Sequence, residues 1–230
     1  MKKVAILQSA YIPWRGYFDL IASVDTFIFY DDVQFSQGDW RNRNIIRTNS
    51  GPKWLTIPVP KKHRIQKNIC DVECSNMNWQ MDHLNKLSES YRKSKYFSSV
   101  FDLLKPLYER DETYISKINH SFIKSICDYI GITTNITWSW DYQSATGKTE
   151  RLVDLCRAAG AATYVSGPAA KSYLDVGLFD EAGIAVEWFS YDGLEPYPQI
   201  HGAFENQVSI VDLLFNAGPE SRRYIPSARE

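Results

Sequence analysis

Short apolar runs alternate with stretches of helical period along the chain. Val4–Gln8 and Thr26–Tyr30 are continuous apolar segments rich in β-branched and aromatic residues, as buried strands are. Between them, Tyr17–Ser23 has the apolar spacing of a short helix. Because a strand, a helix and a second strand follow one another closely, the pattern predicts a βαβ unit and hence a parallel sheet.

The remaining pattern extends this sheet and adds a hairpin. Arg43–Arg47 and Lys53–Pro58 alternate apolar and polar residues around a turn at Asn49–Pro52, which is typical of two antiparallel strands. Further strands and helices are expected at Asn135–Ser139, Thr149–Ala159, Thr163–Val165, Phe179–Ala182, Ala185–Phe189 and Ser209–Phe215.

Residues 79–131 have a helical period throughout, which predicts a helical subdomain that ends at Gly131, a C-capping glycine. Residues 219–230 have little periodicity, so an irregular, exposed tail is expected there. A length of 230 residues fits a single domain, residues 1–230. The expected fold class is α/β and Rossmann-like, with a mainly parallel sheet and a helical insertion at about residues 79–131.

Composition excludes several classes of partner. The formal net charge is −1, from 26 basic and 27 acidic residues, which gives no general attraction to nucleic acid. No stretch approaches the roughly twenty apolar residues of a membrane span. The four cysteines lack paired zinc-type spacing, so structural thiols in a reducing cytoplasm are expected, with no metal centre. The sequence does not indicate an oligomeric state.

Asp31 and Asp32 directly follow the second apolar run, where strands of a parallel sheet present ligand-binding groups. Successive strand residues point to opposite faces, so one of the two carboxylates is expected to enter a site. That carboxylate could hold Mg²⁺, act as a general base, or bind an amine or a sugar hydroxyl. The alternative is a structural role at a turn or a helix cap.

Arg41 and Arg43 come just after Trp40 and would point the same way in an extended segment. Two convergent guanidiniums suit a phosphate or a carboxylate. The structural alternative is a pair of surface salt bridges.

Two glycine-bearing turns follow predicted strands. In the first, Tyr11 and Trp14 could stack on a planar or sugar ring, and Gly16 would allow close backbone approach. The second, Ser166–Asp175, offers a hydroxyl, free amides, the Lys171 cation and a carboxylate. Together with the aspartates and arginines, these turns predict one pocket at the strand ends.

Six longer motifs run through nearly the whole chain. They are Gln8-x-x-Tyr-x-Pro-Trp-x-Gly-Tyr-Phe18, Asp31-Asp-Val-Gln-Phe35, Asp39-Trp-Arg-Asn-Arg43, Gly51-x-x-Trp-Leu-Thr-x-Pro58, Tyr164-Val-Ser-Gly-Pro168 with Tyr173-Leu-Asp175, and Val208-Ser-Ile-Val-Asp-Leu-Leu-Phe-Asn216. In these motifs the chain resembles the WbqC-like protein family. At Ser9 it departs from that family, in which proline tends to follow the glutamine.

The resemblance implies a role in bacterial surface polysaccharide, notably O-antigen, and a glycine transferase activity. The first βαβ unit is also similar to the Rossmann-like domains of nucleotidyl transferases, whose first turn binds nucleotide phosphates. The paired histidines of that turn are absent here, and Trp14–Tyr17 stand in their place.

The leading hypothesis is therefore an enzyme that joins an amino acid, most simply glycine, by an amide to a nucleotide-linked amino sugar or uronic acid. The cofactor or donor is left open: ATP with Mg²⁺, an acyl-CoA or an aminoacyl-tRNA. The alternatives are a nucleotidyl- or glycosyl-transferase of the same pathway, and a non-catalytic nucleotide-sugar-binding protein. The catalytic candidates are Asp31, Asp32 and Lys171. The substrate-binding candidates are Gln8, Tyr11, Trp14, Gly16, Tyr17, Gln34, Trp40, Arg41, Arg43, Ser166, Gly167, Tyr173, Asp175 and His201.

Overall fold

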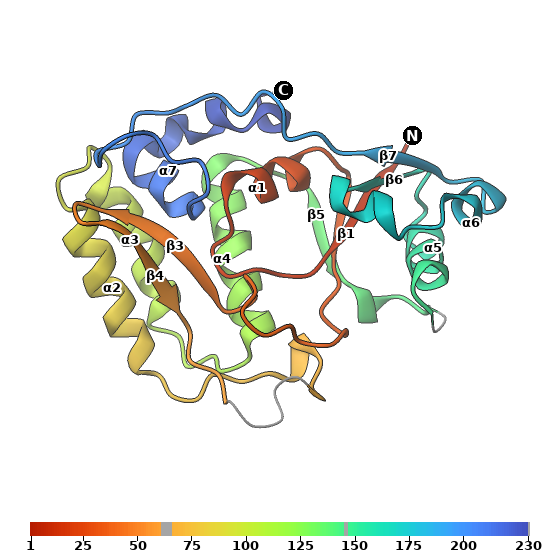
Figure 1. Ribbon diagram of the computed structural model, residues 1–230, viewed down its shortest axis with the longest axis horizontal. Coiled ribbons are helices and arrows are strands. Elements are labelled where there is room, and N and C mark those ends of the chain that lie inside the picture. The colour runs from red at the N-terminus through yellow and green to blue at the C-terminus, as the bar shows by residue number, and fades with distance from the viewer. Residues whose placement is uncertain (61–65, 145–146, 230) are drawn as a thin grey trace.

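A parallel sheet lies at the centre of the computed structural model, which describes residues 1–60, 66–144 and 147–229. Its strands are β1 (Lys3–Leu7), β2 (Thr26–Phe29), β5 (Asn135–Trp138), β6 (Thr163–Ser166) and β7 (Ala185–Trp188). They lie in the order β5-β2-β1-β6-β7, and each neighbouring pair is parallel. The predicted α/β fold with a parallel sheet is therefore confirmed (Figure 1).

The chain changes its direction of travel across the sheet at β1. From β1 it proceeds to β2 and β5 on one side, and then returns past β1 to β6 and β7 on the other. In a Rossmann-type sheet of this order, ligands bind where the order reverses, outside the carboxyl ends of the strands. Here the two strands at the reversal are β1 and β6, which end at Leu7 and Ser166.

Helices cover both faces of the sheet. The described helices are α1 (Arg15–Ala22), α2 (Asn78–Tyr91), α3 (Phe97–Tyr108), α4 (Ile115–Ile130), α5 (Thr149–Ala158), α6 (Val176–Glu181) and α7 (Ile210–Ala217). Because side chains alternate along a strand, Ala5 and Phe27 share a core with α1 and α4, whereas Val4 and Ile28 share another with α5 and α6. In the described ranges, no helix is long and apolar enough to span a membrane.

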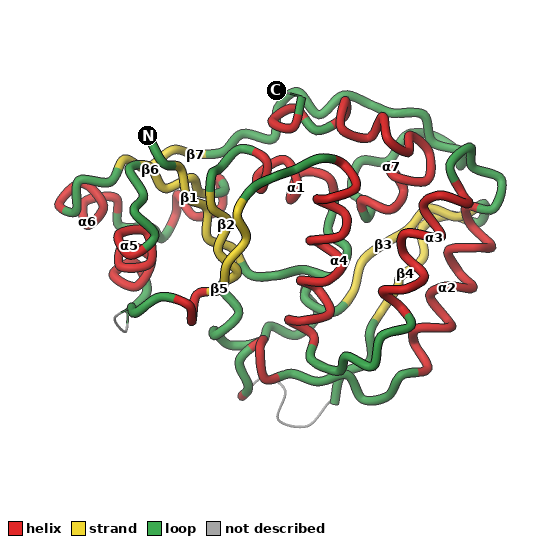
Figure 2. The backbone as a smooth tube through the Cα atoms, turned by 180° about the vertical axis from the view of Figure 1, so that it is seen from behind, coloured by secondary structure: helices red, strands yellow, loops and turns green. Residues whose placement is uncertain are grey.

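The helical segment expected at residues 79–131 consists of α2, α3 and α4 (Figure 2). Gly131 ends α4 with a φ of 76°, in the left-handed region where glycine is favoured. The predicted hairpin is also present, as β3 (Arg43–Thr48) paired with β4 (Gly51–Thr56), and lies beside α2 (Figure 1). Buried residues of the hairpin and of these helices belong to the same core as one face of the sheet, so the segment packs directly against the sheet.

The C-terminal segment is not the exposed arm that its sequence pattern suggested. Two short 3-10 helices, Gly218–Tyr224 and Pro226–Ala228, pack against α1 and α7. Between them Ile225 is completely buried, and the backbone N–H of Ser227 donates to Asp19 Oδ1 at 2.7 Å. The segment escaped prediction because short 3-10 turns do not have the 3.6-residue apolar period of an α-helix.

We predict that Ile225→Ala lowers the free energy of unfolding by about 2–4 kcal/mol, because it leaves a cavity in a closed part of the core. Urea denaturation measures the change. Arg223→Ala is the control: the Arg223 side chain is 79% exposed, so its loss should change stability by less than about 0.5 kcal/mol. Equal stability of the Ile225 variant and the unsubstituted protein would show that the segment is not docked in solution.

Candidate functional site

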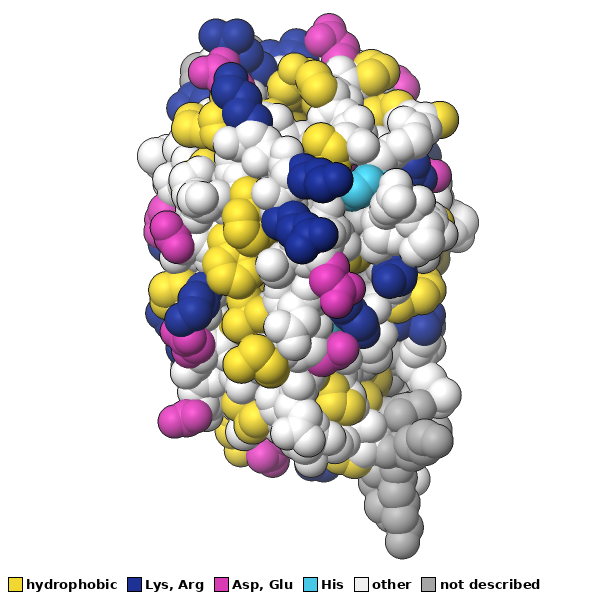
Figure 3. All heavy atoms as spheres, turned by 90° about the vertical axis from the view of Figure 1, so that its left-hand side faces the viewer, with side chains coloured by type: hydrophobic (Ala, Val, Ile, Leu, Met, Phe, Trp, Pro, Cys, Tyr) yellow, Lys and Arg dark blue, Asp and Glu magenta, His cyan; other side chains and the backbone are white. Residues whose placement is uncertain are grey.

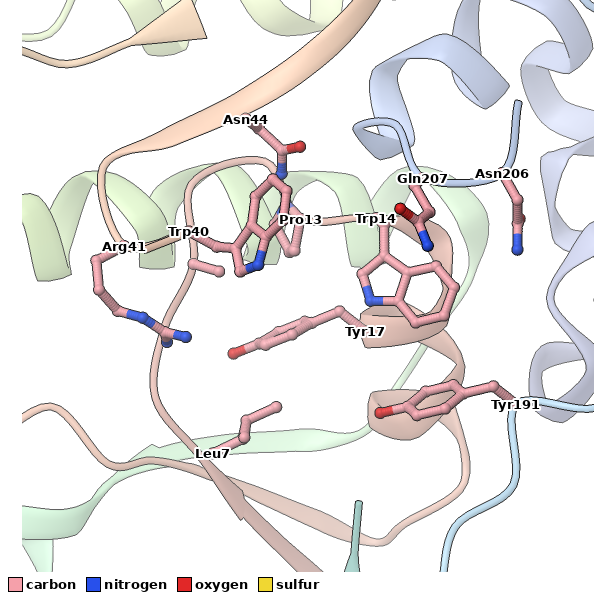
Figure 4. A pocket seen from close by; sticks show the side chains of 11 residues that line it. Leu7, Pro13, Trp14, Tyr17, Trp40, Arg41, Asn44, Tyr191, Asn206 and Gln207 are labelled. Atoms are coloured by element: carbon pink, nitrogen blue, oxygen red, sulfur yellow. The ribbon is translucent and has the colours of Figure 1, made fainter. Parts of the chain in front are cut away.

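A cavity of about 440 Å³ opens at the point where the strand order reverses. It begins at Leu7, the last residue of β1, and is lined by Leu7, Ala10, Pro13, Trp14, Tyr17, Trp40, Arg41, Asn44, Tyr191, Asn206 and Gln207 (Figure 4). Its volume is within the range of sites that hold small molecules. The fold thus places a cavity where a Rossmann-type sheet binds its ligand.

The cavity combines aromatic walls with one cation. Among the described residues that line it, four are aromatic, three carry a carboxamide, and Arg41 is the only one with a charged side chain. Aromatic rings offer flat faces to planar or sugar rings, and a guanidinium binds phosphate or carboxylate. The lining therefore suits a ligand with a ring and an anionic group.

Arg41 is held rigidly with one edge towards the cavity (Figure 4). It is only 8% exposed, and its Nη1 donates to the backbone oxygen of Ser9 at 2.6 Å. Its Nε forms an ion pair with Asp39 Oδ2 at 3.5 Å but no hydrogen bond. A nearly buried guanidinium with spare donors is preorganised for an anion, because little side-chain entropy remains to be lost on binding.

Asp31 lies behind the cavity wall and supports it from the core. The carboxylate is completely buried; Oδ1 accepts the backbone N–H of Ser9 at 2.7 Å, and Oδ2 accepts the hydroxyl of Ser116. Asn119 Nδ2 completes the cluster by donating to Ser9 Oγ at 3.0 Å and to the backbone oxygen of Arg41 at 2.9 Å. Burial raises the pKa of Asp31, and its hydrogen bonds only partly counter this. Asp31 therefore fixes the turn after β1 and does not reach the cavity.

Asp32 points to a different part of the sheet edge. Its two oxygens accept from the hydroxyl of Ser139, just after β5, and from the guanidinium of Arg151 on α5. The two aspartates do diverge, as strand geometry predicted, but neither lines the cavity. Asp32 thus forms an ion pair with Arg151, and the two side chains are 21% and 20% exposed.

The second glycine-bearing turn contributes little to the cavity. Lys171 is exposed and its Nζ lies 5.7 Å from the ring centroid of Trp188. Asp175 caps α6 by accepting the N–H of Gly177 at 3.0 Å, and Tyr173 is 71% exposed. Ser166 is buried at the end of β6, while Gly167 next to it lies near the hydroxyl of the lining residue Tyr191.

Tyr11 is part of the core, not of the cavity. Its hydroxyl is bonded to His83 Nδ1 at 2.9 Å and to the hydroxyl of Tyr108 at 2.7 Å, and the residue is completely buried. Gly16 likewise serves packing: a Cβ at this position would lie 2.3 Å from the indole of Trp14. Glycine is thus required so that the Trp14 ring can fold back over α1 and form a cavity wall.

The other candidates lie around the cavity or away from it. The backbone oxygen of Gln8 accepts the hydroxyl of Tyr17 at 3.0 Å, and Gln34 forms a strand-like bridge with Asn68. The guanidinium of Arg43 lies 4.4 Å from the ring centroid of Trp54. His201 Nε2 is bonded to the backbone oxygen of Ser90, and the residue is not part of the cavity lining. Of the predicted residues, Trp14, Tyr17, Trp40 and Arg41 come together in the cavity lining.

The turn after β1, whose Ala10 and Pro13 line the cavity, is held in a strained conformation. Ile12 has a φ of 36°, which a β-branched residue rarely adopts. Asn44 Nδ2 donates to the backbone oxygens of Tyr11 and Ile12, each at 3.0 Å, and Ser209 Oγ also donates to Ile12 O, at 2.7 Å. Such strain persists where surrounding contacts over-determine the backbone, as they do beside this cavity.

One cavity wall comes from residues 189–209, all described, which contain neither helix nor strand. Tyr191, Asn206 and Gln207 of this segment line the cavity. Loops of this length are uncommon in compact domains and usually serve binding.

Arg15, the first residue of α1, holds this segment in place. Its guanidinium donates to the backbone oxygens of Leu194 and Glu195 at 3.0 and 2.5 Å. It also donates twice to Asn206 Oδ1, at 2.8 and 3.0 Å. Arg15 is 2% exposed and burial lowers its pKa, so the fixed hydrogen-bond acceptors of the segment must compensate for the lost hydration.

Comparison with known proteins agrees with the motifs. The model of the WbqC-like protein family matches residues 8–224. The chain belongs to the WbqC-like protein family. It is 49% identical over 231 residues to an uncharacterized protein of Mycobacterium tuberculosis, Rv1507c, with all of both chains covered. No solved structure matches significantly.

Several cavity residues of this WbqC-like chain were not predicted from its sequence. Asn44, Tyr191, Asn206 and Gln207 lie outside the turns at the first strand ends, and Arg15 stands at a position that the Trp-x-Gly motif leaves open. Tyr191 follows β7 by three residues, so its place near the carboxyl edge of the sheet was a usable signal. The long segment that brings in the others has no period that would reveal its path.

We predict that Arg15→Lys loosens the wall formed by residues 189–209, because an ammonium cannot reproduce the planar fork that binds several acceptors at once. A protease specific for glutamate should cleave at Glu195 or Glu205 on the order of tenfold faster than in the unsubstituted protein, since the loss of about 1.4 kcal/mol raises an opening equilibrium tenfold. Arg157→Lys is the matched control, because the Arg157 side chain is 63% exposed on α5. Unchanged cleavage of the Arg15 variant would contradict this role.

We also predict a pH dependence of stability that arises from His83. Burial lowers the pKa of His83 from 6.5 to about 4, so the unfolded chain takes up a proton before the folded chain does. The stability linked to neutral His83 is complete above pH 6.5 and is lost as the pH falls to about 4, a total of about 3 kcal/mol. His83→Gln should remove this part of the slope in urea denaturation. For each protein, the free energy of unfolding at pH 8 is the reference from which the slope is measured. An unchanged slope below pH 6.5 in the His83 variant would refute the assignment.

Proposed function

We propose that this WbqC-like protein is a transferase that forms an amide between an amino acid, most simply glycine, and a nucleotide-linked amino sugar or uronic acid of surface-polysaccharide synthesis. The observation that carries the proposal is Arg41, a nearly buried guanidinium at the wall of an aromatic cavity of about 440 Å³. Nucleotide-linked sugars combine the features that such a lining suits: rings, hydroxyls and a diphosphate.

In this proposal each part of the lining has a chemical role. The faces of Trp14 and Trp40 stack on the sugar or the base. Arg41 binds the diphosphate or the uronic carboxylate through charge-assisted hydrogen bonds. The carboxamides of Asn206 and Gln207 bind hydroxyls, because an amide can both donate and accept.

The proposed reaction forms a C–N bond by attack of an amine nitrogen on an activated acyl carbon. The bond from that carbon to the leaving group breaks, and the proton of the amine neutralises the departing group. Charge that develops on the acyl oxygen requires a hydrogen-bond donor. The phenol of Tyr191 has an ordinary pKa of 10.0, which burial raises further, so it is protonated at neutral pH and can donate to the acyl oxygen. ATP with Mg²⁺, an acyl-CoA or an aminoacyl-tRNA remains the candidate source of the activated acyl group.

A second candidate function is favoured by one observation. The described lining residues include no carboxylate, histidine, lysine or cysteine that could act as a base or nucleophile. Such a lining would also suit a protein that binds a nucleotide-linked sugar without converting it. The two functions share the ligand and differ only in turnover.

We predict that UDP-glucuronic acid raises the melting temperature, and that Arg41→Gln weakens its binding by about 10–100-fold. The reason is that a hydrogen bond to a charged group contributes about 1.5–3 kcal/mol. Titration calorimetry gives the dissociation constants. A thermal-shift measurement with ligand at a hundred times its dissociation constant then tests the stabilisation, which is about 2.7 kcal/mol at that concentration.

Asp32→Asn is the control for this experiment, because Asp32 lies outside the cavity lining and its loss should leave ligand affinity nearly unchanged. A greater loss of affinity in the Asp32 variant than in the Arg41 variant would move the site to the end of β2. Binding without release of product, in the presence of glycine and each of the three donors, would favour the binding protein.

A further inference from the structure

The outer face of the β3–β4 hairpin is aromatic and basic. On β3, Asn44 and Ile46 face the core, whereas Arg43, Ile45 and Arg47 alternate with them on the other side. Trp54 of β4 is paired with Ile45, so it lies on the same outer face as the two arginines. Figure 3 shows the neighbouring side of the molecule, at α2 and α3, where basic, acidic and apolar side chains are mixed on the surface.

Two indoles form a projecting stack on this face. The rings of Trp40 and Trp54 lie 5.6 Å apart with an interplanar angle of 27°, and yet each residue is more than 40% exposed. Trp40 also lines the cavity, so the stack continues the cavity wall out onto the hairpin. A stacked pair is rigid, which lowers the entropy cost of binding a ligand against it.

Neither Arg43 nor Arg47 forms an ion pair with a carboxylate among the described residues, although the buried carboxylate of Asp212 lies within electrostatic range of Arg47. Arg43 donates to the backbone oxygen of Gly38 and lies over the Trp54 ring. Arg47 donates to the backbone oxygens of His201 and Ala203, at 2.7 and 2.9 Å. Backbone oxygens accept from the Nη2 groups only, and the Nε of each arginine has no hydrogen-bond partner among the described residues. A carbonyl oxygen carries no full negative charge, so the face attracts an anionic partner.

We propose that this outer face, formed by Trp40, Trp54, Arg43 and Arg47, binds an acidic saccharide chain that extends from the sugar in the cavity. The inference rests on the proposed function, which puts a nucleotide-linked sugar in that cavity. The C–H face of a sugar ring packs against an indole, and its carboxylates pair with guanidiniums. Continuity with the cavity through Trp40 favours a saccharide over a lipid surface or RNA, neither of which would need to enter the cavity.

The face thereby gives the proposed transferase an acceptor-chain subsite next to its nucleotide-sugar site. A strand of six residues extends ~20 Å at about 3.3 Å per residue, so the hairpin can contact several sugar units beyond the cavity.

The test uses the full chain and a linear tetramer of galacturonic acid as the probe, with maltotetraose as its neutral counterpart. We expect the acidic tetramer to bind more tightly than the neutral one, and to protect tryptophan fluorescence from quenching by acrylamide. Trp54→Ala and Arg43→Gln should each weaken its binding at least tenfold. Binding of UDP-glucuronic acid should change by less than about threefold in the Trp54 variant, because Trp54 does not line the cavity.

Trp140→Ala is the matched control. Trp140 is 45% exposed and is stacked on Trp138 at 4.5 Å, but it follows β5, two strands away from β1. An equal loss of tetramer binding in this variant would overturn the proposal, as would failure of the acidic tetramer to bind.

The two proposals fail in distinguishable ways. Binding of UDP-glucuronic acid without binding of the tetramer overturns the acceptor surface alone. Failure of the unsubstituted protein to bind UDP-glucuronic acid overturns the proposed function. Tighter binding of anionic lipid vesicles or of RNA than of the tetramer, abolished by Trp54→Ala, would reassign the face to that partner.

Discussion

The buried carboxylate of Asp31 is the constraint on which the candidate site depends. Removing a carboxylate from water costs several kcal/mol, and only well-formed hydrogen bonds offset this cost. Ser9 and Ser116 supply them, and Asn119 connects Ser9 to the backbone of Arg41. Because a partly satisfied network of this kind is costly, its members must assemble together. The end of β2, helix α4 and the turn after β1 are thus fixed by one cluster.

This cluster also holds the guanidinium of Arg41 at the cavity wall. The backbone oxygen of Ser9 accepts from Arg41, so the residue whose N–H satisfies Asp31 also orients the guanidinium. A proline at this position could not satisfy Asp31 in this way, because proline has no N–H to donate. Arg15 is also a buried charge; through Leu194, Glu195 and Asn206 it fixes the opposite wall. Both walls are therefore positioned by charges that lie outside the cavity itself.

The elements of the fold were largely predictable, whereas the site was predictable only in part. Strands such as β1 and β2 are short apolar runs, and α4 has a long stripe that ends in Gly131, so local pattern decides their structure. The path of residues 189–209 depends on contacts with Arg15, which is far away in sequence, and no local pattern encodes it.

The same physical reason governs the candidate residues. The tyrosines at positions 11 and 17 both have an apolar ring with a polar end, and from the sequence alone either could line a pocket. In the core, the hydroxyl of Tyr11 forms hydrogen bonds with His83 and Tyr108, so it is not available to a ligand in the cavity. Asp31 and Asp32 are likewise equivalent in sequence, and only the packing of α4 against β2 decides which of them is buried.

Asp31 and Asp32 both lie outside the cavity lining, and this limits how the proposed reaction can dispose of a proton. An amine is nucleophilic only when uncharged, yet the described lining of the cavity contains no side chain that readily takes up its proton at neutral pH. Before attack, the proton of the ammonium must then pass to a substrate phosphate or to water, and the proton that the nitrogen loses as the amide forms passes to the leaving group. A thioester or an ester donor meets this requirement, because its departing thiolate or alkoxide accepts a proton. A free carboxylic acid does not, unless it is activated first. The lining therefore favours a mechanism in which the protein aligns two reactive substrates and the donor supplies the driving force.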